Sequence, residues 1–160
     1  MPNDTASQLI SAFLELFDEA YNGPPDPKST WFTDNAPNAA LLGTLDGLDA
    51  EHASLLQASG QSLASHAEHL RWSLVLAQAY FRGEQPRPDW EESWRVQSVT
   101  QAQWETLRGD LKREYEAVRS AIAAVSDWSN PFFLKGTLAL LPHAAYHLGA
   151  IRQMVKSVSQ

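Results

Sequence analysis

Cysteine is absent from the 160-residue sequence, which excludes disulfide bridges, thiolate metal ligands and a cysteine nucleophile. Positive charge is scarce, because 12 lysine and arginine residues stand against 19 aspartate and glutamate residues. Nucleic-acid binding needs clustered positive charge, so this balance argues against a nucleic-acid partner. The lack of cysteine fits a reducing compartment, and we expect a cytoplasmic protein.

Long apolar runs are also absent. No stretch approaches the ~18 apolar residues of a membrane-spanning helix, so we expect no membrane partner. The first four residues, Met1-Pro2-Asn3-Asp4, lack the positive charge and apolar run of a signal peptide. The length suits a single domain, which we predict to span residues 1–160, and 44% hydrophobic residues are enough for a packed core.

Helical periodicity predicts the architecture. Apolar residues recur on one helical face near the N-terminus, at Ile10, Phe13, Leu14, Phe17 and Tyr21, and similar patterns recur three more times. Capping-box pairs are present as Thr5 with Gln8 and as Thr100 with Gln103. No strand-like alternation is seen. The sequence therefore predicts an all-α four-helix bundle, with long helices at about 5–21, 62–81, 101–125 and 130–158 and short helical turns within 39–60.

Proline-rich and aperiodic segments mark the breaks between these helices. Residues 22–38 hold four prolines and read as a loop, which we expect Trp31 and Phe32 to pin to the body. Residues 83–99 form a connection above the usual length for paired helices, so the helices on either side are not a simple hairpin. Pro142 removes a backbone hydrogen bond, which predicts a kink there or a helix start near Leu141.

Histidines carry the most suggestive chemistry. His143 and His147 are four residues apart and share one helical face, so their imidazoles can bind one divalent ion. His66 and His69 lie three residues apart on the 62–81 helix, and either can supply a third ligand. His52 lies in a polar stretch and is expected at the surface. Three protein ligands with one open position are typical of catalytic zinc-type sites. The alternative is that these histidines are ordinary core residues, because an isolated HxxxH pair is a weak motif.

Two segments resemble a known family. SHAEHLRW at 65–72 and HAAYHLGAIRQ at 143–153 are similar to the DinB-like proteins, which are small metal-binding four-helix bundles. The resemblance implies an up-down-down-up bundle with a long crossover between its second and third helices, which residues 83–99 can supply. It also implies a three-histidine metal site formed by the 143/147 pair and one ligand on the second helix. Related proteins often place that histidine three residues before an aromatic residue, which favours His69, before Trp72, over His66.

The resemblance also implies a range of functions. Members of the wider superfamily include thiol S-transferases and a mycothiol-dependent isomerase, and family members commonly form homodimers. Our first hypothesis is therefore a metal-dependent transferase that uses a low-molecular-weight thiol as its nucleophile, which suits a chain without cysteine, on a small-molecule substrate. A metal-dependent hydrolase and a non-catalytic, stress-associated metal-binding protein are the alternatives. Imidazole ligands suit zinc, nickel and iron alike, so the identity of the metal is left open.

Overall fold

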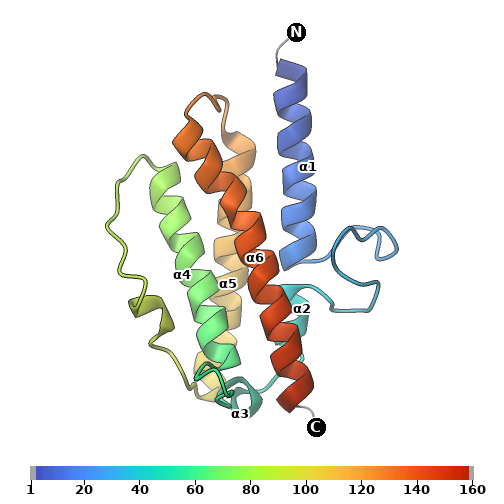
Figure 1. Cartoon of the computed structure of the whole chain (residues 1–160), viewed down its shortest axis with the longest axis vertical. Coiled ribbons are helices and arrows are strands. Elements are labelled where there is room, and N and C mark those ends of the chain that lie inside the picture. Colours follow the sequence, from blue (N-terminus) through green and yellow to red (C-terminus); the bar gives the residue numbers. More distant parts are fainter. Residues whose placement is uncertain (1–2, 159–160) are drawn as a thin grey trace.

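The computed structural model describes residues 3–158, with side chains described from residue 5 onward. Four long helices lie alongside one another (Figure 1): α1 (Asn3–Tyr21), α4 (Leu63–Phe81), α5 (Gln101–Ala124) and α6 (Pro131–Val158). Two short helices, α2 (Leu41–Asp46) and α3 (Ala50–Ala53), and a 3₁₀ turn, η1 (Glu92–Trp94), lie in the connections. The part of the chain that is described contains no strand, so the all-helical prediction is confirmed. No helix within it is both long and apolar enough to cross a membrane.

Local capping explains where two of the long helices begin. The Ser62 hydroxyl accepts from the Ser65 backbone and the Ser65 hydroxyl accepts in return, which starts α4. Thr100 and Gln103 make the same reciprocal pair at the start of α5, as their spacing predicts. The corresponding expectation for Thr5 is wrong, because α1 already begins at Asn3 and Thr5 lies inside the helix.

Helix α6 is continuous through its internal proline. It runs from Pro131 to Val158, so the alternative start near Leu141 is wrong. The Asn130 side chain accepts from the backbone N–H groups of Phe132 and Phe133, which caps the helix at its true beginning. Packing of α6 against both α1 and α4 compensates for the hydrogen bond lost at Pro142, since helices in proteins depend more on tertiary packing than on local propensity.

Loop 22–38 is attached to the body by a buried carboxylate and not by its aromatic residues. Trp31 is 82% exposed, so the expectation that it pins the loop is wrong. The carboxylate of Glu19, only 1% exposed, instead accepts hydrogen bonds of 2.8–3.0 Å from the backbone N–H groups of Trp31, Phe32 and Thr33 and from the Thr33 hydroxyl. Backbone donors in a partly buried loop need acceptors, and this single side chain provides them.

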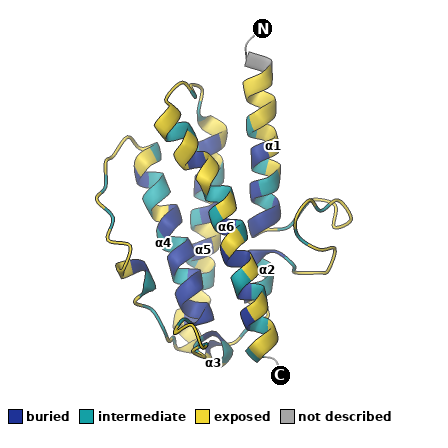
Figure 2. Cartoon of the chain, in the orientation of Figure 1, coloured by how far each residue is buried: buried dark blue, intermediate teal, exposed yellow. Residues whose placement is uncertain are grey.

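The core runs through all four long helices. Phe17 and Tyr21 of α1 pack on Tyr115 of α5, with ring centroids 5.6 and 4.9 Å apart. Trp104 of α5 is fully buried and donates its indole N–H to the Leu48 carbonyl. Helix α4 is buried most deeply along its N-terminal half (Figure 2). This half carries His66 and His69, so both lie in the interior of the bundle.

The connection between α4 and α5 follows α4 back along its length before α5 begins (Figure 1). It contains η1, which packs against α4. The expectation that helices on either side of residues 83–99 do not form a simple hairpin is therefore in keeping with the structure. This route brings Trp90, Ser93 and Trp94 against the histidines of α4.

Candidate metal site

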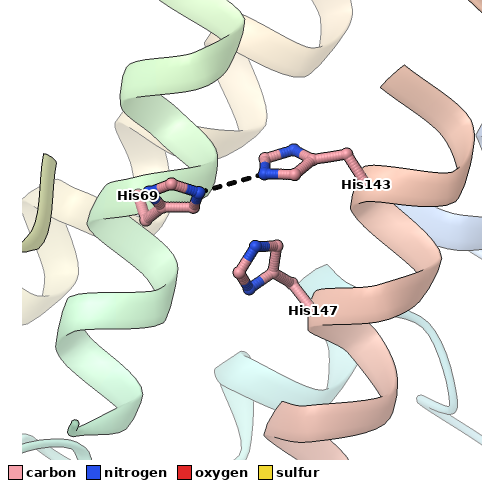
Figure 3. A group of neighbouring side chains, drawn as sticks. All are labelled: His69, His143 and His147. Carbon is pink, nitrogen blue, oxygen red and sulfur yellow. Dashed lines mark hydrogen bonds between the residues drawn. The ribbon is translucent and has the colours of Figure 1, made fainter. Parts of the chain in front are cut away.

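Three histidines from two helices converge between α4 and α6 (Figure 3). His69 of α4 and the pair His143 and His147 of α6 each offer a ring nitrogen, and these nitrogens all lie within 4.8 Å of one another. His69 and His147 are buried and His143 is partly buried. The fully buried alanines Ala67 and Ala144 neighbour these histidines on the two helices and take up little of the interior volume. The group can therefore hold a metal ion, as the sequence predicts.

The spacing of the nearest two nitrogens fits a shared ion. The Nε2 atoms of His69 and His143 are 3.0 Å apart. Two nitrogens that are each ~2.0–2.1 Å from one ion are separated by roughly 2.9 Å at a right angle and by roughly 3.3–3.4 Å in a tetrahedral arrangement. The observed distance lies between these values, so an ion can take the place of the proton shared by the two rings without a large movement of either.

A hydrogen-bond chain fixes which nitrogen of His69 faces the site. The Ser93 hydroxyl donates its only proton to the Trp90 carbonyl, at 2.6 Å. The same hydroxyl lies 2.7 Å from Nδ1 of His69 and must therefore accept there, so Nδ1 carries the hydrogen. Nε2 of His69 is then left with its lone pair toward the site. An outer hydrogen bond of this kind is the usual companion of a metal-binding histidine.

A fourth histidine, His66, contacts His147 on the side away from the other two rings. Nδ1 of His66 lies 2.9 Å from Nδ1 of His147, and His66 is outside the group that can hold the ion. Since Nδ1 of His147 is engaged by His66, its Nε2 is the nitrogen that faces the other two rings, as Figure 3 shows. The group that can hold an ion thus contains His69 with the α6 pair, while His66 contacts His147 from outside that group.

Aromatic residues from the connection close one side of the site. The Trp94 ring is stacked on His69, with centroids 4.0 Å apart and planes at 18°. It also meets the edge of His66 at 5.2 Å. The sequence showed no sign of the roles of Ser93 and Trp94, because a serine and a tryptophan in an aperiodic segment follow no pattern that marks a metal site.

Burial keeps the four interior histidines neutral. It lowers the pKa of His69 to about 4, with neighbouring His143 and His66 adding to the effect. It lowers the pKa of His147 to about 3, again reinforced by the surrounding histidines. Burial also lowers the pKa of His66 and of His143. Neutral imidazole is the form that binds a metal, so the rings are ready for coordination at neutral pH without first losing protons to solvent.

The set of donors limits the chemistry. Within residues 3–158 the group contains three imidazoles and no carboxylate, and such a set suits zinc, nickel, iron or copper. Because the protein supplies only three ligands, a fourth position is left for a small molecule. His52 takes no part, because its ring pairs with Asp49 at 2.7 Å and its side chain is 45% exposed. Its expected surface position is confirmed.

A cavity of about 670 Å³ opens beside the site, between α4, α6 and the start of the connection that follows α4. His143 forms part of its wall, so one edge of the metal group is accessible from this space. Trp90, which packs near His69 with centroids 5.8 Å apart, lines the cavity as well. The volume is in the usual range for small-molecule sites.

No protein-family model, curated protein or solved structure matches the chain. The resemblance of segments 65–72 and 143–153 to the DinB-like family therefore stays a prediction from the sequence.

Proposed function

We propose that the protein is a divalent-metal-dependent enzyme of the DinB-like kind, with His69, His143 and His147 as its metal ligands. The observation that carries this proposal is the convergence of three neutral imidazoles, one of which is held in a defined tautomer by Ser93. A core without a functional site has no need of such an arrangement, because buried polar side chains cost free energy unless each has a partner.

The proposed reaction is a transfer that uses a low-molecular-weight thiol as the nucleophile. When bound, a divalent ion supplies Lewis acidity and lowers the pKa of a thiol at the open position. Ser93 orients the ring of His69, and His66 orients the ring of His147. Trp94 shields His69 from solvent on one face. The sulfur must come from a small molecule, since the sequence has no cysteine.

The cavity beside His143 favours catalysis over a purely structural role for the metal. A structural site is closed by four protein ligands, whereas this group contains three and borders an open space. A metal-dependent hydrolase is less well supported, because no carboxylate of the described chain joins the group as a ready general base. The hydrolase and a non-catalytic metal-binding protein are the two alternatives, and activity assays distinguish them from the transferase.

The proposal includes the up-down-down-up order of the long helices and a homodimer. The helix order is supported by the connection that returns along α4, since it lets α5 start from the same end of the bundle as α4 (Figure 1). The homodimer follows from the family resemblance and is checked by sedimentation equilibrium, in which a monomer mass at micromolar concentration contradicts it.

Metal analysis of untagged protein tests the ligand set. We expect one divalent ion per chain in the wild type and in His52→Gln, the control. We expect His69→Ala, His143→Ala and His147→Ala to lose the ion, whereas His66→Ala keeps it with reduced affinity. Wild-type metal content in His69→Ala, or complete loss in His66→Ala together with retention in His69→Ala, contradicts the proposed ligands.

Activity assays then separate the three functions. Metal-loaded protein is incubated with monochlorobimane and several low-molecular-weight thiols, and in parallel with a panel of esters and amides. The transferase predicts thiol conjugation that requires both the metal and His143. Ester or amide turnover alone identifies a hydrolase. Equal rates for loaded and metal-free protein in both assays contradict an enzymatic role.

A further inference from the structure

The cavity beside His143 extends along α6. Its α6 wall extends from Phe132 to His143, and the eleven helical steps between them, at ~1.5 Å each, cover roughly 16 Å. The opposite wall is the C-terminal half of α4, and residues 83–86 with Trp90 form a third side. A ligand that follows the α6 wall is therefore extended, with one end next to the three-histidine group.

The walls of the cavity are mainly apolar and aromatic. Phe133 is one of the lining residues and is in edge contact with Phe81 and stacked on Trp128, with centroids 5.1 and 5.6 Å apart. Phe132, 72% exposed, and Trp90 add further ring surface. Rings fixed by their neighbours give a ligand a rigid surface, because little side-chain entropy is lost on binding.

Three polar side chains of the walls, those of Ser73, Thr137 and Glu84, already have partners inside the protein. The Ser73 hydroxyl donates to the Leu70 carbonyl, and the Thr137 hydroxyl donates to the Phe133 carbonyl. The carboxylate of Glu84 pairs with Arg82 at 2.6 Å. No lysine or arginine is among the described residues that line the cavity, so an anionic ligand finds no counter-charge on its walls.

A glycine at the cavity wall preserves the free space. Gly136 lies inside α6, and a Cβ atom built on it meets nothing within 4 Å. Glycine is a poor helix former, so local propensity does not explain its place inside α6. Any larger side chain here would extend into open space beside the cavity wall, which makes this position a natural place to reduce the cavity without disturbing the core.

We infer that this cavity binds a neutral, elongated molecule with an aromatic or aliphatic body, and that one end of this molecule lies at His143 beside the metal group. This inference rests on the proposed function, for which it names the class of substrate. It assigns the apolar substrate, and not an anionic thiol, to this space.

Binding of a probe series tests the inference without measuring activity. The probes are acetohydroxamic acid, benzohydroxamic acid and 4-phenylbenzohydroxamic acid, which share one metal-binding hydroxamic acid head on an uncharged body, and 4-carboxybenzohydroxamic acid, whose body carries a carboxylate. Titration calorimetry gives their affinities for the cobalt-loaded and the metal-free protein, and the visible spectrum of cobalt reports the metal separately. We expect each added ring to tighten binding by about tenfold or more, from burial of apolar surface, and the carboxylate to weaken it.

Gly136→Leu and Ala139→Leu reduce the cavity at two positions of α6. Gly109→Leu is the matched control, because Gly109 is also helical and open to solvent but lies outside the cavity. Both cavity variants are expected to remove the gain from the added rings, while the control keeps it. The inference is overturned if the affinity does not depend on the number of rings in the probe, or if the gain from added rings is unchanged in both cavity variants. If no spectrum of bound cobalt is seen, the metal site is refuted instead. The affinities of the metal-free protein for probes with zero, one and two rings then still test whether the cavity binds an apolar body.

Discussion

The hydroxyl of Ser93 determines which ring nitrogen of His69 carries the hydrogen. Its proton goes to the Trp90 carbonyl, which leaves only a lone pair for Nδ1 of His69. We therefore expect Ser93→Ala to weaken zinc binding about 10- to 100-fold, the usual cost of losing an outer hydrogen bond at a metal site. A competition titration against a chromophoric chelator measures this. Ser98→Ala changes an exposed serine of the same connection and should bind zinc like the wild type, and equal affinity in both variants would refute the role of Ser93.

Two buried histidines determine how the free energy of unfolding of the metal-free protein depends on pH. Burial lowers the pKa of His69 to about 4 and that of His147 to about 3 in the folded protein, whereas both titrate near 6.5 in the unfolded chain. Between these values the unfolded chain binds protons that the folded chain does not. The free energy of unfolding must then decrease as the pH falls through 6.5, and it continues to decrease toward pH 4.

Urea unfolding of metal-free protein at pH 7.5, 6.0 and 5.0 measures this loss of stability. The double variant His69→Gln/His147→Gln should show a shallower decrease than the wild type, because the two buried groups no longer titrate. His52→Gln removes a histidine outside the site and should keep the wild-type slope. A wild-type slope in the double variant would show that other groups cause the pH dependence.

Among the elements, loop 22–38 depends on one carboxylate of α1. Burial alone would raise the pKa of Glu19, but hydrogen bonds from Phe32, Thr33 and Trp31 hold it below the ordinary value. In Glu19→Gln an amide replaces one of the acceptor oxygens and faces backbone donors. We expect this change to reduce the free energy of unfolding by on the order of 2 kcal/mol and to speed proteolysis within the loop. Glu15→Gln, an exposed change one turn earlier in α1, is the control, and identical digestion of both variants would contradict the anchoring role.

The elements also show what local sequence can and cannot predict. The start of α5 was predictable because the Thr100–Gln103 box is a local interaction. The continuity of α6 through Pro142 was not, since packing on α1 and α4 maintains it. The exposed position of Trp31 was not predictable either, because aromatic residues are usually buried and nothing in the pattern marked Glu19 as the residue that holds the loop.

For the site, spacing was informative only within a helix. His143 and His147 face one way because four residues make about one turn. His66 and His69 share a flank of α4, so spacing could not separate them, and their different roles appear only when His147 is placed between the helices. Ser93 could not be found from sequence, because its contact with His69 depends on the path of the whole connection.

At the scale of the whole molecule, the four long helices share one core, so we expect a single cooperative thermal transition. Zinc at 100 times its dissociation constant should stabilise the folded chain by ~2.7 kcal/mol, which for a domain of this size raises the transition by roughly 5–11 °C. Differential scanning calorimetry with and without zinc measures the shift, and a chelator should reverse it. In His147→Ala the shift should disappear, and an equal shift in that variant would place the ion elsewhere.

The distance along the chain between the two halves of the metal group has a consequence during protein synthesis. His69 and His143 are separated by 74 residues, which a ribosome adds in roughly 4–15 seconds. A nascent chain that ends before α6 carries no more than one of the three donors. An ion that binds at the proposed site therefore meets an almost finished fold, so a pocket between helices selects it and not a short nascent peptide.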